Sequence, residues 1–254
     1  MSARDMLYSA NRVLRRRLRD VPSIRSAYGL LLVLEQSLRD NSANGRRELN
    51  SQFESRMDPW GYATVPNERR RHQVELQMLD AVHPGSRFGK ALEIGCAEGI
   101  FTAMLAERCN SLLAVDISSV ALERAQHRCE REEHVRFQEL DIRVDPLPGS
   151  FDLVVVVHVL EYIRNPMALR SIREKIIASL CDGGYLLLGH VSNDHFMETA
   201  LWSKHLIRGG RNITAFMGSH PALHVVDSQE IELADGRSIE MLCCKNPGPA
   251  GGVR

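Results

Sequence analysis

The stretch from residue 90 to residue 191 alternates short apolar runs with longer runs of helical periodicity. Runs of β-branched and aliphatic residues predict strands, and apolar residues that recur every three or four positions predict helices. The predicted strands are 90–96, 111–118, 134–141, 151–160 and 185–191, and the predicted helices are 101–109, 120–130 and 166–180. Repeated strand–helix units predict an α/β fold, in which helices cover both faces of a parallel sheet.

The last part of the chain carries two strand-like runs joined by a turn. LHVVDSQEIEL (223–233) and RSIEMLCCK (237–245) flank Ala234-Asp235-Gly236. Two such runs around a short turn predict an antiparallel hairpin that closes one edge of the sheet. The remaining residues, 246–254, are expected to form a flexible tail, as chain termini commonly do.

The N-terminal region has a different character. Residues 4–20 hold six arginines and apolar residues at helical spacing, which predicts a basic amphipathic helix. This helix either packs on the domain surface or contacts an anionic partner. Residues 27–39 predict a second, more apolar helix, and the polar segment 39–48 predicts a break with a turn at Asn44-Gly45. We therefore expect an N-terminal helical extension at 1–45 and a catalytic domain at 46–245.

Composition and charge narrow the function classes. The 32 basic and 32 acidic side chains give no net charge, so no general field attracts nucleic acid, and no nucleic-acid partner is expected. No apolar stretch approaches the roughly 20 residues that span a bilayer. The N-terminus has no signal-peptide pattern, and the six cysteines form no C-x-x-C pair, so we expect a cytoplasmic protein without a metal site.

The first predicted strand ends in a glycine-rich turn. The segment Glu93-Ile94-Gly95-Cys96-Ala97-Glu98-Gly99 joins this strand to a helix, where the backbone can approach a ligand closely. The segment lacks the middle glycine of the dinucleotide fingerprint, and an acid precedes its first glycine. A carboxylate at that position suits a cationic ligand better than a diphosphate.

Two more acids follow the next two strands. Asp116 ends the second predicted strand, where a carboxylate can accept hydrogen bonds from both ribose hydroxyls. Asp141 follows the third strand, where it can accept one from the exocyclic amine of adenine. Open α/β sheets bind ligands at the carboxyl ends of their strands, so the turn and the two acids predict one nucleoside site.

Five segments resemble the motifs of class I S-adenosylmethionine-dependent methyltransferases: LEIGCAEG, AVDIS, ELDI, FDLVVVVHVLEYIRNP and SLCDGGYLLL. The resemblance covers residues 88–191. It implies a Rossmann-like seven-stranded sheet with an antiparallel last strand, S-adenosyl-L-methionine (SAM) as cofactor and S-adenosyl-L-homocysteine (SAH) as product. The cofactor contacts that it implies are Glu93, Gly95, Cys96, Ala97, Gly99, Asp116, Ile117, Asp141, Ile142 and His158.

A narrower resemblance adds a substrate class. Asp58-Pro59-Trp60, the helix ERRRHQ (68–73) and the run LEIGC.EG.FT resemble the NodS-like methyltransferases. Founding members of that group N-methylate the amino sugar of a chitooligosaccharide signal. The resemblance therefore implies methyl transfer to a nitrogen or oxygen atom of a small molecule, with an amino sugar as one possibility.

Several side chains are candidates for the acceptor side of the site. His158 either takes a proton from an incoming amine or hydroxyl, or only lines the cofactor pocket. Glu161 shapes the acceptor site or starts a helix, and His190 faces the acceptor cleft as a contact or base. Trp60 is expected in a lid over the cofactor, and one arginine of the 69–71 run, assigned to Arg70, meets its carboxylate.

Two other function classes stay open at this point. One is a nucleic-acid or protein methyltransferase, and the other is a SAM-binding module without catalysis. DNA N-methyltransferases typically carry an (N/D)PP(Y/F) motif after the fourth strand, and this chain has His158-Val159-Leu160-Glu161 there. The small-molecule methyltransferase is therefore the favoured interpretation.

Overall fold

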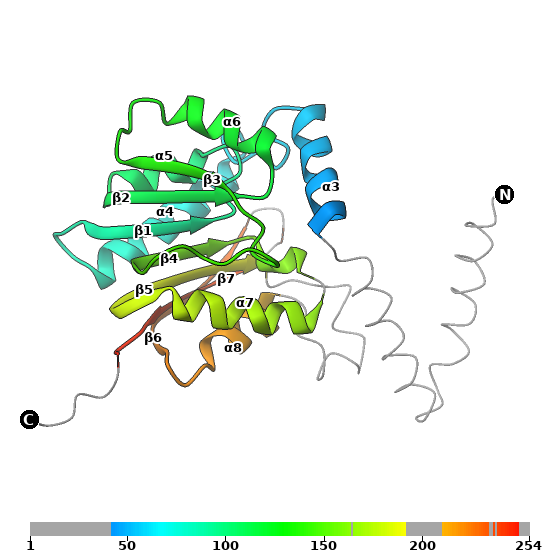
Figure 1. The fold of residues 1–254 in the computed structure, drawn as a ribbon. Coiled ribbons are helices and arrows are strands. Elements are labelled where there is room, and N and C mark those ends of the chain that lie inside the picture. Colours follow the sequence, from blue (N-terminus) through cyan, green and yellow to red (C-terminus); the bar gives the residue numbers. More distant parts are fainter. Residues whose placement is uncertain (1–41, 164, 192–209, 234–235, 237, 249–254) are drawn as a thin grey trace, which may run out of the picture. The chain divides into compact units, whose positions relative to one another are not determined.

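One seven-stranded sheet organises the described part of the chain (Figure 1). The computed structural model describes residues 42–163, 165–191, 210–233, 236 and 238–248. The predicted N-terminal helices, most of the predicted 234–236 turn and the end of the tail lie outside these residues.

The described elements follow the predicted alternation. The helices are α3 (Ser42–Ser55), α4 (Pro66–Val82), α5 (Ile100–Ala106), α6 (Ser119–Arg128), η2 (Leu160–Tyr162, a 3-10 turn), α7 (Pro166–Ala178) and α8 (Gly210–Gly218). The strands are β1 (Phe88–Ile94), β2 (Cys109–Asp116), β3 (Val135–Glu139), β4 (Phe151–Val157), β5 (Leu180–Val191), β6 (His224–Glu232) and β7 (Ser238–Lys245). Every strand and helix predicted between residues 90 and 191 is confirmed, with shifts at the ends.

The strand order is β3-β2-β1-β4-β5-β7-β6. Strands β1 to β5 pair in parallel, and β7 pairs antiparallel with both β5 and β6, which confirms the predicted hairpin and the antiparallel last strand. Strand β1 lies between β2 and β4, so the chain crosses from one side of β1 to the other after β3. Such a switch in strand order opens a crevice at the carboxyl ends of the strands, where ligands bind.

The two large apolar clusters among the described residues lie on opposite faces of the sheet. One cluster joins β1 and β4 to α7 and α8, through residues such as Leu92, Val154, Leu169 and Met217. The other joins the opposite face to α4 and α5. Strand β4 contributes Val154 and Val156 to the first cluster and Leu153 and Val155 to the second, so it is buried on both faces as predicted.

Local sequence signals fix where several helices begin. Asn165 accepts hydrogen bonds from two backbone N–H groups at the start of α7, and Pro166 occupies the first position, where no N–H is needed. The Ser118 hydroxyl caps α6 in the same way. Helix α4 starts with Pro66 and carries Glu68 in its first turn, where a carboxylate favours the helix dipole.

The predicted turn at Asn44-Gly45 is wrong, because these residues lie within α3. The glycine has a packing role there. A Cβ atom on Gly45 would lie 2.5 Å from Nη2 of Arg143, so the missing side chain makes room for that guanidinium. Gly183 and Gly184 fall inside β5.

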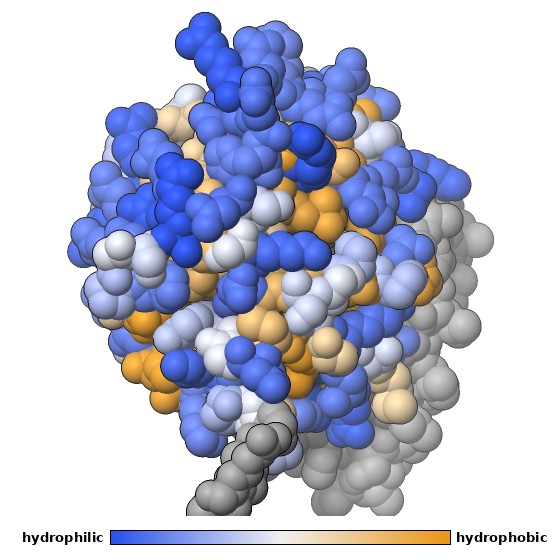
Figure 2. All heavy atoms as spheres, turned by 60° about the vertical axis from the view of Figure 1, so that its left-hand side comes forward, coloured by the Kyte–Doolittle hydropathy of each residue, from blue (hydrophilic) through white to orange (hydrophobic). Residues whose placement is uncertain are grey.

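The surface turned forward in Figure 2 is mainly hydrophilic, with apolar residues in small separate groups. The exposed large apolar side chains are Met57, Val65, Val144, Tyr162, Met167, Val225 and Val226. Within the described residues, no helix combines the length and the apolar character needed to cross a membrane.

Candidate functional site

The turn after β1 adopts a left-handed backbone at three positions: Gly95 (φ +80°), Ala97 (φ +48°) and Gly99 (φ +75°). A Cβ atom on Gly95 would lie 2.2 Å from the Val159 side chain, so glycine is needed for space as well as for conformation. The backbone N–H groups of Gly95 and Cys96 both donate to the carbonyl of Val115, at 2.7 and 3.1 Å. The turn is therefore held against the end of β2.

Asp116 ends β2 beside this turn and is 8% exposed. Its carboxylate accepts hydrogen bonds from the backbone N–H groups of Ala97 and Ser118, both at 2.9 Å and each on a different oxygen. Burial raises the pKa of Asp116, and the backbone hydrogen bonds act in the opposite direction. Each oxygen has two lone pairs, so the carboxylate can still accept ribose hydroxyls.

Asp141 is buried after β3 and is already bound to an arginine. Arg143 donates from Nε to Oδ1 at 2.9 Å and from Nη2 to Oδ2 at 3.0 Å. Helix α3 lies beside this end of the sheet, since Arg46 pairs with Glu139 and Asn50 contacts Ser118. An adenine amine at Asp141 would therefore share the carboxylate with Arg143.

Glu93 lies near the end of β1 with 2% of its surface exposed. Burial raises the pKa of its carboxyl group to about 8, and the nearby Asp116 and Glu75 carboxylates act in the same direction. Its Oε2 atom is buried and has no hydrogen-bond partner among the described residues, and the Thr102 side chain near the carboxyl group acts to lower its pKa. A buried carboxyl oxygen without a partner at the glycine turn is a place for a cationic ligand group.

The segment between α3 and α4 packs onto the glycine turn. The backbone N–H of Asp58 donates to Glu98 at 2.8 Å, and Glu98 pairs with Arg124 of α6 at 2.6 Å. Phe53 packs edge-on against Trp60, with ring centroids 5.0 Å apart. Trp60 thus belongs to a segment that is held against the turn, and its predicted role as a lid over the cofactor stays a prediction.

Helix α4 presents a buried guanidinium toward the carboxyl ends of the strands. Arg71 is 2% exposed, donates to Glu68 and Glu75 at 2.9 Å each, and contacts Nε2 of His72 at 2.9 Å. Its guanidinium also lies over the Tyr62 ring, 5.3 Å from the centroid. Burial, reinforced by Arg71, lowers the pKa of His72 to about 3, so this ring is a neutral hydrogen-bond acceptor.

The structure favours Arg71 over Arg70 as the arginine of this run that faces the site, and a contact of either with the cofactor stays a prediction. Arg70 lies on the exposed side of α4, and its neighbour Arg71 is the buried arginine. Successive helix residues are about 100° apart around the axis, so only one of three consecutive arginines can face the sheet directly. Glu68, Arg71 and Glu75 have the spacing of one helix face, and this signal was missed.

His158, Glu161 and His190 form one hydrogen-bonded group. Glu161 contacts Nδ1 of His158 through Oε1 at 3.1 Å and Nδ1 of His190 through Oε2 at 3.0 Å. Burial alone would raise the pKa of Glu161, but the two histidine hydrogen bonds outweigh it and lower the pKa well below its usual range. An ionised carboxylate only accepts hydrogen bonds, so the Nδ1 atom of each ring carries a hydrogen.

The two Nε2 atoms of this group are buried, and neither has a partner among the residues that the structure describes. Burial, together with Arg71, lowers the pKa of His158, so its ring is neutral near pH 7. His158 has φ +55°, and its backbone N–H donates to the Gly189 carbonyl at 2.8 Å, which fixes the ring between β4 and β5. A neutral imidazole held by a carboxylate is suited to accept a proton.

These groups lie side by side at the carboxyl ends of neighbouring strands of the sheet. Asp116 is at β2, Glu93 at β1, His158 after β4 and His190 at the end of β5. The order places the nucleoside-type contacts at one end and the proton acceptors at the other.

The sequence matches the family model for nodulation protein S (NodS) over residues 42–232, which is most of the chain. The chain belongs to the NodS family. Nodulation protein S of Rhizobium tropici is 33% identical over 132 residues, which are 52% of this chain and 54% of that protein. Nodulation protein S of Bradyrhizobium diazoefficiens is 32% identical over 137 residues, 54% of this chain and 64% of that one. The chain thus spans between half and two thirds of the length of these NodS relatives.

Solved structures agree with the NodS assignment. The N-methyltransferase NodS from Bradyrhizobium japonicum WM9, in complex with S-adenosyl-L-homocysteine, is 27% identical and has a TM-score of 0.69. The match covers 82% of this chain and 100% of that one. Magnesium protoporphyrin IX methyltransferase from Synechocystis PCC 6803 has a TM-score of 0.64 at 15% identity, which shows the fold alone. The predicted Rossmann-like methyltransferase fold and the NodS resemblance are both confirmed.

Most of the predicted site residues lie at one edge of this NodS-family sheet. Cys96 and Ile142 are buried, and Ile117 is partly buried after β2. The structure adds residues that were not predicted, namely Glu68, Arg71, His72, Glu75 and Thr102. The ligand contacts of all these residues stay predictions.

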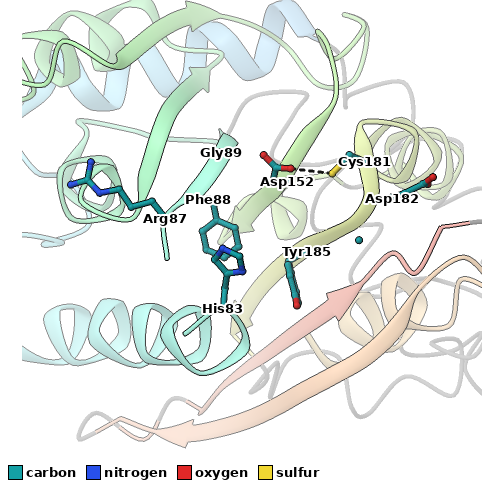
Figure 3. A pocket seen from close by; sticks show the side chains of 9 residues that line it. His83, Arg87, Phe88, Gly89, Asp152, Cys181, Asp182 and Tyr185 are labelled. Carbon is teal, nitrogen blue, oxygen red and sulfur yellow. Dashed lines mark hydrogen bonds between the residues drawn. The ribbon is translucent and has the colours of Figure 1, made fainter. Parts of the chain in front are cut away.

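A pocket of about 250 Å³ lies at the opposite edge of the NodS-family sheet (Figure 3). It is lined by His83, Arg87, Phe88, Gly89, Asp152, Cys181, Asp182, Gly183 and Tyr185. Figure 3 shows the dashed hydrogen bond from Cys181 to Asp152, which measures 3.3 Å. This pocket adjoins the amino ends of β1 and β4, away from the crevice that the strand order creates.

Proposed function

We propose that the protein is a SAM-dependent methyltransferase that moves a methyl group to a nitrogen or oxygen atom of a small molecule. The observation that carries this proposal is the row of buried groups along one sheet edge, from Asp116 through Glu93 to His158. The nucleoside-type contacts and the proton acceptors lie on neighbouring strands, as a transfer from cofactor to acceptor requires.

The residues present fit the cofactor. The left-handed turn at Gly95 and Gly99 lets backbone approach a ligand, and Asp116 has lone pairs for ribose hydroxyls. The unpartnered Oε2 of Glu93, within the described chain, suits the ammonium of a methionine moiety. The bound cofactor supplies an electrophilic methyl group on a sulfonium.

The protein's own task is to receive a proton from the acceptor. Nε2 of His158 takes that proton as the acceptor nitrogen or oxygen becomes a nucleophile. Glu161 accepts the Nδ1–H of the resulting imidazolium and stabilises its charge, which is the role of a positioning residue. His190 holds the second oxygen of Glu161 and so fixes the orientation of the carboxylate.

The relatives support this choice of chemistry. The structure from Bradyrhizobium japonicum WM9 is that of an N-methyltransferase, and it contains the demethylated product of SAM. A nitrogen acceptor, such as the amine of an amino sugar, is therefore the first acceptor to test.

Location and partners belong to the same proposal. We propose a cytoplasmic enzyme, supported by six cysteines that are all free thiols. The arginine-rich segment 4–20, which lies outside the described residues, is proposed to contact an anionic partner through its arginines.

Cofactor binding is tested by calorimetry with SAH. We expect one SAH per chain, and Asp116→Ala should weaken binding at least tenfold, because hydrogen bonds to a charged acceptor contribute roughly 1.5–3 kcal/mol. A thermal melt checks that the variant is folded. Unchanged SAH affinity in a folded variant would remove Asp116 from the cofactor site.

Methyl transfer is tested by SAH release from SAM, with D-glucosamine and D-glucose as a matched pair of acceptors. We expect SAH release that depends on glucosamine, and we expect Asp116→Ala to abolish this release. SAH binding without transfer to either sugar, or to a wider set of amines and alcohols, would favour the non-catalytic binding module.

A further inference from the structure

Glu75 on α4 is an acid that the mechanism above does not use. Its side chain is completely buried, and Oε1 accepts a hydrogen bond from Nη1 of Arg71 at 2.9 Å. Its other oxygen, Oε2, is buried and has no hydrogen-bond partner in the part of the chain that the structure describes. Most buried polar atoms in folded proteins are bonded, so this oxygen indicates a missing ligand group.

The position of Glu75 is fixed by its contact with β5. A Cβ atom on Gly189 would lie 3.3 Å from Oε1 of Glu75 and 3.2 Å from Val157, so glycine allows the close approach. The carbonyl of Gly189 binds the backbone N–H of His158. Glu75 and His158, the proposed base, therefore both lie next to Gly189.

Glu75 lies near Glu93, whose pKa it raises, but on the side toward β5. Glu93 belongs to β1, and Glu75 contacts β5, with β4 lying between these two strands. With ribose at β2 and the methionine moiety at β1, the acceptor lies toward β4 and β5. Glu75 is thus on the acceptor side.

The charges around Glu75 favour a cation. Glu68 and Glu75 both bind the guanidinium of Arg71, and Glu161 lies against His158. Burial raises the pKa of Glu75 and Arg71 acts in the opposite direction, so a cation beside Glu75 favours its ionised form. Burial keeps His72 and His158 neutral, so neither ring offsets the excess of acids. An arriving ammonium would restore the balance and occupy the unpartnered oxygen.

We propose that Glu75 binds the acceptor as an ammonium ion beside His158 and makes the site selective for amines over alcohols. This inference rests on the proposed function. An alcohol carries no positive charge, so it leaves the buried carboxyl group of Glu75 with Arg71 as its cationic partner. An ammonium supplies the charge and presents its proton to the neighbouring base.

The probe is sinefungin, a SAM analogue that carries an ammonium where SAM carries its transferable methyl group. SAH lacks that ammonium, so the ratio of the two affinities reports the environment at the methyl position without any acceptor. We expect the wild-type protein to prefer sinefungin and Glu75→Gln to lose about tenfold or more in sinefungin affinity, with SAH affinity changed by less than about threefold.

Glu68→Gln is the matched control. Glu68 also accepts a hydrogen bond from Arg71 at 2.9 Å, so this variant removes a similar charge from the same guanidinium. It should leave the ratio of sinefungin to SAH affinity as in the wild type. An equal change of the ratio in both variants would assign the effect to Arg71 and overturn the proposal.

The remaining outcomes are also decisive. Parallel loss of both ligands in Glu75→Gln, or no loss of either, would refute the assignment of Glu75. Failure of the wild type to bind either ligand would refute the proposed function itself, which is a different result. If Glu75→Gln does not fold, Gly189→Ala displaces the carboxylate by contact, and it should lower sinefungin affinity selectively.

Discussion

Buried polar atoms without partners mark the site at the scale of single residues. Within the described residues they include Oε2 of Glu75, Oε2 of Glu93 and Nε2 of His158 and His190. Each unpaired buried polar atom is costly in free energy, so their grouping at one sheet edge requires ligand groups to complete them.

Glu93 leads to a pH prediction. Its pKa of about 8 means that the free protein holds this carboxyl protonated at pH 7, because burial disfavours the charged form. A bound ammonium favours the ionised form, so cofactor binding should release a proton. SAH affinity should therefore rise with pH between 6 and 7.5, by up to about tenfold per unit.

Calorimetry in buffers of different ionisation enthalpy measures the released proton directly. Glu93→Gln retains the shape of the neutral carboxyl group and cannot ionise, so its SAH affinity should not change through this proton. A wild-type affinity that is flat over the same range, with no proton released, would contradict the prediction.

The cofactor motifs could be predicted because each is a short segment at a strand end. The glycine turn, Asp116 and His158 follow apolar runs whose ends the sequence defines closely. The choice between Arg70 and Arg71 could not be made from the run of arginines alone, because it depends on which side of α4 meets the sheet. The contact of Glu161 with His190 depends on the pairing of β4 with β5, which lies beyond local sequence.

Helix α3 is one of the elements that the sequence patterns missed, as is α8. Helix α3 is mostly polar, and its main buried anchor is Phe53, which is 2% exposed and packs on Trp60. The carbonyl of Phe53 also accepts a hydrogen bond from Arg124 at 2.7 Å. One aromatic residue in a polar segment gives little periodicity, so tertiary contacts decide where this helix lies.

Phe53→Ala tests that interpretation. Removing a buried phenylalanine side chain should lower the free energy of unfolding by about 3–5 kcal/mol, because it loses apolar burial and leaves a cavity. Urea unfolding measures this difference. Phe137→Ala serves as the comparison, since Phe137 is only partly buried and should cost less. A loss below about 1 kcal/mol for Phe53→Ala would mean that α3 is not anchored through this ring.

At the scale of the whole molecule, the family match includes all of the described part of α3. The NodS match starts at residue 42, and Ser42 is the first described residue of α3. A domain boundary between residues 45 and 46 would cut the first described turn of α3 and remove Gly45, which Arg143 contacts. We therefore propose that the catalytic domain begins at Ser42.

A chain that starts at Ser42 should fold and bind SAH as the full chain does, since all the described cofactor-side residues lie beyond that point. A chain that starts at Arg56 lacks α3 and the Phe53 anchor, and it should melt at a lower temperature and bind SAH more weakly. Thermal melts and calorimetry on the two chains check this. Loss of folding in the Ser42 chain would show that residues 1–41 complete the core.

The carboxylate of Glu161 is shared by two imidazole rings, those of His158 and His190. This sharing limits the number of extra protons that the two rings can carry at the same time. One negative charge can balance one imidazolium, and a second positive ring at the same carboxylate would meet repulsion from the first. In the proposed mechanism, this group therefore carries one proton at a time. Glu161 is 27% exposed, which gives that proton a route to solvent. We therefore expect each new acceptor to wait until the previous proton has left, so that a higher buffer concentration accelerates turnover.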